Sequence, residues 1–224
     1  TTSGGKMEES GEKSEKCHLI ITKFGLDFGK NVENFQISNR RFGRRFIEAL
    51  GLVKWACAKA NEDLGKLDSK VSEPIQKKAL EVSEGKHDQH FILDIYQTGS
   101  GTSTNMNANE VIARVASADS ELAIHPNDHV NYGQSSNDVI PTTIHVSAAL
   151  EINNQLLPAL LHLRRTLKSK AEEVGHHCKT GRTHLMDAMP VTMGQVLTGW
   201  ANQVEQQLRN LEAVLPSLHK LAQG

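Results

Sequence analysis

Aromatic side chains, long apolar runs and an excess of either charge are all missing from this 224-residue sequence. Phe, Trp and Tyr together make up 4% of the residues, which favours helices packed on helices over an aromatic-rich β-sandwich. No apolar run approaches the ~20 residues that a membrane-spanning helix needs, so we expect no membrane segment. The 25 basic and 26 acidic side chains lack the basic excess of a nucleic-acid-binding protein.

Cysteine is also rare, and its pattern bears on the compartment. Cys17, Cys57 and Cys178 are odd in number and widely spaced, so they form neither a disulfide framework nor a CxxC metal pair. We interpret them as free thiols in a reducing compartment. The polar N-terminus carries no secretory signal, and residues 1–16 are too acidic for a transit peptide. We expect a cytoplasmic protein and leave a mitochondrial location open.

The composition changes along the chain and predicts three parts. Residues 1–16 are mainly Gly, Ser, Glu and Lys, which cannot offset the entropy lost on ordering a chain. We expect a flexible tail and irregular lead-in over residues 1–38. An N-terminal helical domain that carries polar loops should follow over 39–138, and the first part of a truncated helix bundle over 139–224.

Apolar residues recur at helical spacing in the predicted N-terminal domain. Steps of three and four residues between positions 46 and 64 place the apolar side chains on one face of a helix, which Gly65 would end. A second, weaker helix is predicted over 72–82, with Pro74 in its first turn. The short apolar run at 91–96 is either a buried strand or an extended lead into the next loop.

Two long helices are predicted in the second half of the chain, over residues 142–174 and 191–222. Leucines repeat along the first, and apolar residues keep a near-heptad spacing along the second. Pro158 and Pro216 lie inside these patterns, and because the periodicity resumes after each, we expect kinks rather than helix ends. Each stripe needs another long helix to cover it. The sequence therefore predicts a mainly α fold with a long-helix bundle and a smaller helical N-terminal domain.

Three polar stretches interrupt the helical pattern, and the first covers residues 98–107. It holds two glycines, five hydroxyl side chains and two amides, before a helix predicted to begin near Ala108. Because helix N-termini attract anions, this stretch is either a cradle for a carboxylate or phosphate, or a flexible linker. It lacks the lysine of a P-loop and the third glycine of a dinucleotide fingerprint.

The second polar stretch covers residues 125–129 and continues at 134–138. Imidazole, amide and hydroxyl groups gather here without apolar neighbours. They form either a second carboxylate-binding cluster or a simple turn, because His-Pro-Asn-Asp is typical of turns. Two histidines and Asp128 make a weak case for a metal ion, and we expect none.

The third polar stretch, residues 181–190, is interpreted as a loop that joins the two long helices. It places His184 at a bundle end, where an imidazole could transfer protons near neutral pH. A lone histidine in a loop is more often simply solvated, so the spacing leaves both interpretations open. His176 and His177 suit the C-terminus of the preceding helix better than a metal site.

Together these stretches carry a family resemblance that spans about residues 42 to 224. Their order, spacing and residues are similar to the signature regions of class II fumarases, members of the fumarase/aspartase superfamily. The matching motifs are Gly99-Ser100-Gly101-Thr102 with Asn105-Met106-Asn107, His125-Pro126-Asn127-Asp128-His129 with Gln134-Ser135-Ser136-Asn137-Asp138, and Gly181-Arg182-Thr183-His184-Leu185. The resemblance implies a mainly α-helical subunit in a homotetramer, with active sites shared between subunits.

The resemblance also implies a role for each matching residue. The groups expected to bind the substrate carboxylates are Ser100, Thr102, Asn105, Ser135, Ser136 and Asn137. Thr183 and His184 are the expected catalytic residues, with His184 positioning or activating the acid/base water. A secondary anion-binding segment is implied for His125, Asn127 and Asp128.

The reaction implied by the resemblance is the reversible hydration of fumarate to L-malate, a step of the tricarboxylic acid cycle, with no metal or cofactor. A base removes a proton beside a carboxylate, and the charge spreads onto that group as an aci-carboxylate. Donors aimed at its oxygens would stabilise the transition state. A small dicarboxylate is thus the expected partner, with neither nucleic acid nor membrane.

Other functions stay open at the level of sequence. Thr183-His184 is the fumarase-like form, whereas Gly101-Thr102-Ser103 is closer to the aspartase pattern, so aspartate ammonia-lyase is one alternative. A non-catalytic helical assembly module is the other. Members of the family are about twice as long, and the signature loop that supplies their presumed catalytic serine has no counterpart in these residues. We therefore expect the isolated chain to be inactive.

Overall fold

A computed structural model describes residues 37–97 and 101–223, which fall into two compact units. The first unit contains the described residues up to Ser147 together with residues 221–223. The second contains Ala148–Lys220. Most of the tail and lead-in expected over residues 1–38 lies outside the described residues.

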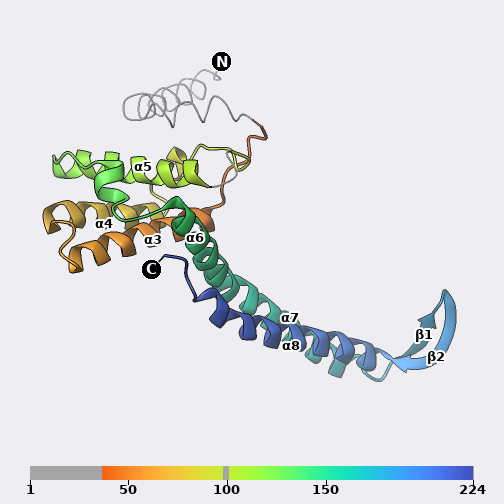
Figure 1. Ribbon diagram of the computed structural model, residues 1–224. Coiled ribbons are helices and arrows are strands. Elements are labelled where there is room, and N and C mark those ends of the chain that lie inside the picture. The colour runs from red at the N-terminus through yellow and green to blue at the C-terminus, as the bar shows by residue number, and fades with distance from the viewer. Residues whose placement is uncertain (1–36, 98–100, 224) are drawn as a thin grey trace, which may run out of the picture. The chain divides into compact units, whose positions relative to one another are not determined.

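Three helices form most of the first unit. They are α3 (Arg44–Asp63), α4 (Ser69–Ser83) and α5 (Thr102–Ser120), and they lie side by side in Figure 1. An apolar core fills the space between them, because each amphipathic helix turns its apolar stripe away from water. The fully buried members of this core include Leu50, Ile75, Val82, Ile112 and Val139.

The two helices predicted in this region are confirmed with corrections. α3 ends where expected, and Gly65 follows it with φ +65°. Leu64, assigned to the buried stripe, is 71% exposed, because the last turn of α3 borders an open pocket rather than the core. α4 begins before the predicted residue 72, because the Asp68 carboxylate caps it by accepting the Lys70 N–H at 2.8 Å. Pro74 therefore lies inside the helix rather than in its first turn.

The segment between α4 and α5 contains a 3₁₀ turn, η1 (Asp88–His90), followed by extended chain and a turn over residues 91–96. Of the two interpretations of this apolar run, the extended lead is the correct one. Phe91 and Leu93 are buried without strand pairing. The Asp94 carboxylate fixes the segment by accepting the Ser38 backbone N–H at 2.6 Å.

The start of α5 corrects the prediction for the first polar stretch. Residues 102–107, expected in a loop before Ala108, form the first turns of the helix. Gly101 caps the start of this helix with a φ of +74°, a left-handed conformation that glycine adopts readily. A π-helical turn, η2 (Pro126–Val130), and α6 (Ser136–Glu151) follow.

The first long helix starts earlier and is less regular than predicted, and the second is shorter than predicted. The one expected over 142–174 starts at Ser136 as α6, passes through a π turn, η3 (Ile152–Leu156), and continues as α7 (Leu157–Glu173). The irregular turn ends at Leu156, two residues before Pro158, whose missing N–H interrupts the regular hydrogen-bond pattern. The other long helix is α8 (Met193–Leu218), which contains Pro216 and begins with a Thr192–Gln195 capping box.

In the second unit, α7 and α8 pack side by side (Figure 1). Arg164 and Glu205 form an ion pair of 2.5 Å between them, and Leu197 and Leu208 are buried. Trp200, by contrast, is 53% exposed. The mainly α fold is confirmed, and no helix in the described ranges is long and apolar enough to cross a membrane.

The connection between α7 and α8 is a β-hairpin, not the loop that was predicted. Strands β1 (Cys178–Thr183) and β2 (Met186–Thr192) pair antiparallel, and Thr183 pairs with Met186. The turn therefore consists of two residues, His184 and Leu185, with φ of 47° and 59°. Such turns usually contain Asn-Gly, so His-Leu gave no sequence signal for a hairpin.

Candidate active site

The first two polar stretches meet where α5 and α6 begin. The hydroxyl oxygens of Thr102 and Ser136 lie 3.1 Å apart. Gly101 allows this approach, because a Cβ at this residue would lie only 2.7 Å from Ile140 Cγ1 of α6. Two helix N-termini, each with a partial positive charge, thus converge beside two hydroxyl groups. The arrangement is suited to an anion.

Asn105 lies one turn into α5 and belongs to the same cluster. Its Nδ2 donates to Asn131 Oδ1 at 3.2 Å, which leaves the second N–H of this amide for another acceptor. Asn105 Oδ1 is buried and has no hydrogen-bond partner among the described residues. Buried polar atoms are usually paired, but this oxygen is an acceptor, so the part of Asn105 that could bind a carboxylate is its Nδ2 donor and not Oδ1.

The remaining carboxylate-binding candidates are less enclosed. Ser135 Oγ accepts the Asn137 N–H at 3.2 Å and so caps α6. Both Ser135 and Asn137 are exposed. Ser100 lies outside the described residues. The structure therefore brings Thr102 and Ser136 together, with Asn105 one turn further along α5.

The predicted secondary anion segment is a compact turn. His125 Nδ1 accepts the Asp128 N–H at 3.2 Å and lies 3.1 Å from Asp128 Oδ2. His129 Nδ1 accepts the His125 N–H at 2.9 Å. Asn127 is exposed in the middle of this turn. The segment forms a turn, which leaves its part in anion binding untested, and no group of three or more His, Cys, Asp or Glu in the described ranges is arranged to hold a metal ion.

Thr183 and His184 belong to the second unit, at the tip of the β-hairpin. Both side chains are exposed, and His184 has no hydrogen-bond partner in the part of the chain that the structure describes. The hairpin is held by its strand pairing and by an exposed ion pair of 2.9 Å between Arg182 and Asp187. The third polar stretch thus presents its histidine to the surroundings.

Lys54 is a buried residue near the site that sequence reasoning did not identify. Its Nζ donates to Asn131 Oδ1 at 3.0 Å and to Gln134 Oε1 at 2.9 Å. Burial lowers the pKa of Lys54 to about 7, and the same burial raises the pKa of the nearby Cys57 thiol. The sequence held one signal, because a lysine four residues after Leu50 lies on the apolar face of the predicted helix.

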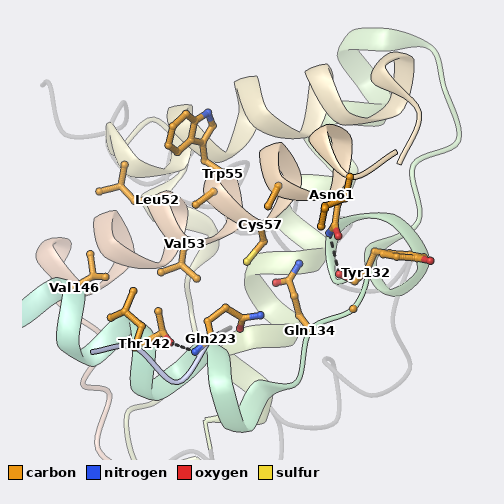
Figure 2. Close-up of a pocket in the computed structure, with 15 residues that line it drawn as sticks. Leu52, Val53, Trp55, Cys57, Asn61, Tyr132, Gln134, Thr142, Val146 and Gln223 are labelled. Atoms are coloured by element: carbon orange, nitrogen blue, oxygen red, sulfur yellow. Dashed lines mark hydrogen bonds between the residues drawn. The ribbon is translucent and has the colours of Figure 1, made fainter. Parts of the chain in front are cut away.

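A separate pocket of about 630 Å³ lies in the first unit (Figure 2). Its lining is largely apolar and includes Leu52, Trp55 and Val146. The backbone N–H of Gln223 donates to Thr142 Oγ1 at one side, at 2.9 Å. An apolar lining of this kind offers little to a small dianion, so we locate the candidate site at the helix N-termini instead.

Comparison with known proteins identifies the family. A family model described as a lyase matches residues 27–224, which is most of the chain. The chain belongs to this lyase family. Curated relatives include a fumarate hydratase class II 2 from Pseudomonas aeruginosa, 55% identical over 201 residues that make up 90% of this chain. Another, a fumarate hydratase class II from Xylella fastidiosa, is 50% identical over 205 residues, and the match covers 92% of this chain.

Solved structures of this lyase family agree with the fold. A class II fumarase from Schistosoma mansoni superposes with a TM-score of 0.84 at 40% identity, and the match covers 88% of this chain and 43% of that one. A fumarate lyase:delta crystallin from Brucella melitensis gives 0.82 at 35% identity, with 88% and 48% covered. The chain spans 44% of the length of the Pseudomonas aeruginosa relative and 43% of the Xylella fastidiosa relative.

Proposed function

We propose that this lyase-family chain is part of a fumarate hydratase that interconverts fumarate and L-malate. The observation that carries the proposal is the 55% identity to a class II fumarate hydratase over 90% of the chain. The site geometry supports it, because the motif residues Thr102 and Ser136 lie 3.1 Å apart where two helices begin.

The chemistry of the reaction fits the groups gathered there. A dicarboxylate needs hydrogen-bond donors and positive potential, and the two helix N-termini with Thr102, Asn105 and Ser136 supply both. When a proton leaves the carbon beside a carboxylate, the extra charge moves onto that carboxylate. Fixed donors that already point at its oxygens stabilise the charge without reorganisation. We assign the same role to Ser100, Ser135 and Asn137, and propose that the reaction uses no metal or cofactor.

The residues of the second unit complete the proposal. We assign the reacting end to Thr183 and His184, because an exposed imidazole on a two-residue turn can serve a site formed with another subunit. A homotetramer with shared active sites is part of the proposal, supported by the exposed apolar side chains of α7 and α8 such as Leu163 and Trp200. His125, Asn127 and Asp128 are proposed as a secondary anion site.

The proposed compartment rests on cysteine chemistry. Cys57 and Cys178 are both free thiols in the structure. Free thiols are typical of a reducing environment, so we propose that the protein acts in the cytoplasm.

Turnover by the full-length gene product tests the proposed function. The purified protein should form fumarate from L-malate, followed by the ultraviolet absorbance of fumarate. L-Aspartate serves as the competing substrate, and we expect no fumarate and no ammonia from it. Release of ammonia from L-aspartate with no reaction of L-malate would replace the hydratase proposal with an ammonia-lyase. Absence of both reactions would contradict lyase activity on four-carbon dicarboxylates altogether.

A further inference from the structure

Lys54 occupies an unusual position for a lysine. Its side chain is wholly buried in α3, with 0% of its surface exposed. Lysine is almost never fully buried without an ionic partner, because an ammonium group loses much hydration energy in the interior. Among the described residues its hydrogen bonds go to two amide oxygens, on Asn131 and Gln134, and no carboxylate pairs with it.

These two amides connect Lys54 to the start of both site helices. Asn131 Oδ1, which accepts from Lys54, also accepts from Nδ2 of Asn105 in the first turns of α5. Asn131 Nδ2 donates to the Gln134 carbonyl at 2.9 Å, and Gln134 Nε2 donates to the Val130 carbonyl at 2.9 Å. The segment 130–134 is therefore tied to Lys54 at two points.

This segment leads directly into α6. Gln134 is followed by the cap residue Ser135, and α6 begins at Ser136. Only Ser135 separates Gln134 from α6, so the position of Gln134 limits where the N-terminus of α6 can lie. Through Asn131 and Gln134, Lys54 is thus connected to the start of α5 and to the start of α6, the two helices that bring Thr102 and Ser136 together.

We infer that Lys54 is a positioning residue that sets the N-terminus of α6 opposite that of α5 through Asn131 and Gln134. The inference rests on the proposed function, since the site that Lys54 positions is the one assigned to the dicarboxylate. Lys54 lies beneath this site and acts on the substrate through other residues. An apolar side chain in its place would fill the space, but it would leave Gln134 Oε1 without its donor and Asn131 Oδ1 with the Asn105 amide alone.

The test combines kinetics with amide hydrogen exchange on the full-length gene product. The variant Lys54→Met removes the ammonium and keeps a long side chain. Lys59→Met is the matched control, because Lys59 lies on the same helix and is an exposed residue bonded to Asp63. In Lys54→Met, we expect the KM for L-malate and the inhibition constant of succinate to rise about tenfold, equivalent to about 1.4 kcal/mol. The kcat should change much less.

Hydrogen exchange provides a readout that does not depend on turnover. Amides of residues 130–140 should exchange faster in Lys54→Met than in the wild type, while amides of α4 keep their rates. A merely structural role of Lys54 would instead accelerate α4 as well and leave the KM unchanged. A folded Lys54→Met protein with unaltered KM, or with unaltered exchange over 130–140, overturns the inference.

Two further arrangements keep the test decisive. If Lys54→Met does not fold, Gln134→Leu removes one acceptor while retaining the lysine, and the same changes in KM and exchange are expected. If the wild type does not convert L-malate, the proposed function fails by itself. The exchange comparison over 130–140 then still decides whether Lys54 holds this segment.

Discussion

Gly101 offers the sharpest test of how α5 and α6 are brought together. The residue has φ +74°, and a Cβ there would lie 2.7 Å from Cγ1 and 2.8 Å from Cγ2 of Ile140. The variant Gly101→Ala therefore carries two costs. A left-handed conformation costs an alanine about 1 kcal/mol, and an overlap in a packed region costs about 1–3 kcal/mol more. We expect the free energy of unfolding to fall by about 3 kcal/mol, the middle of that sum.

Two companion variants separate the costs. Gly65→Ala meets the same backbone requirement, with φ +65°, but a Cβ at this residue would have no atom within 4 Å, so the variant should lose only about 1 kcal/mol. Combining Gly101→Ala with Ile140→Ala should cost less than the sum of the two single changes, because the smaller side chain removes the overlap. Urea unfolding followed by circular dichroism measures the wild type, the three single variants and the double variant. If Gly101→Ala is no less stable than Gly65→Ala, the close approach of α5 and α6 is refuted.

Three other outcomes follow from the structure. Gly51→Ala should lower the free energy of unfolding by about 2 kcal/mol or more in urea, because its Cβ would lie 2.7 Å from the Ser83 backbone nitrogen. Gly199→Ala in α8 has open space around the new Cβ and should raise the free energy of unfolding by up to about 1 kcal/mol. Equal effects of the two variants would contradict the packing of α3 on α4. The pKa of Lys54 lies at about 7 in the folded protein and at its ordinary 10.5 when unfolded. The unfolded state therefore binds more protons between these values, and stability should fall by up to about 5 kcal/mol as the pH drops from about 10.5 to about 7; in Lys54→Met this part of the pH dependence, measured by urea unfolding at several pH values, should vanish. His184→Asn should lower kcat for L-malate by roughly 100-fold or more while the oligomer size in gel filtration stays the same, and full activity would remove His184 from the reaction.

Much of the fold could be predicted because amphipathic helices can be recognised in a sequence from the spacing of their apolar residues. The spacing that predicted α3 and α8 reflects the burial that stabilises them, and Gly65 ends α3 as its backbone freedom suggests. Helix starts were less accurate. The cap at Asp68 and the left-handed Gly101 each begin a helix earlier than the apolar pattern does.

The site could be predicted in its motifs but not in its geometry. The residues Thr102 and Ser136 were identified from sequence, yet their contact depends on Gly101 fitting against Ile140, which no local pattern encodes. The β-hairpin was missed because His184 and Leu185 adopt positive φ in a turn that usually contains Asn-Gly. Lys54 was missed because its partners lie far along the sequence, at Asn131 and Gln134.

The measurement that tests the central claim most directly is the kinetics of Ser136→Ala in the full-length gene product with L-malate. Ser120→Ala is the matched control, since that hydroxyl lies at the far end of α5 and donates to the Ala116 carbonyl of its own helix. Loss of one donor to the developing carboxylate charge should lower kcat/KM by roughly 100-fold in Ser136→Ala, and the control should keep wild-type kinetics. Equal kcat/KM values in the two variants would contradict a dicarboxylate site at the N-termini of α5 and α6.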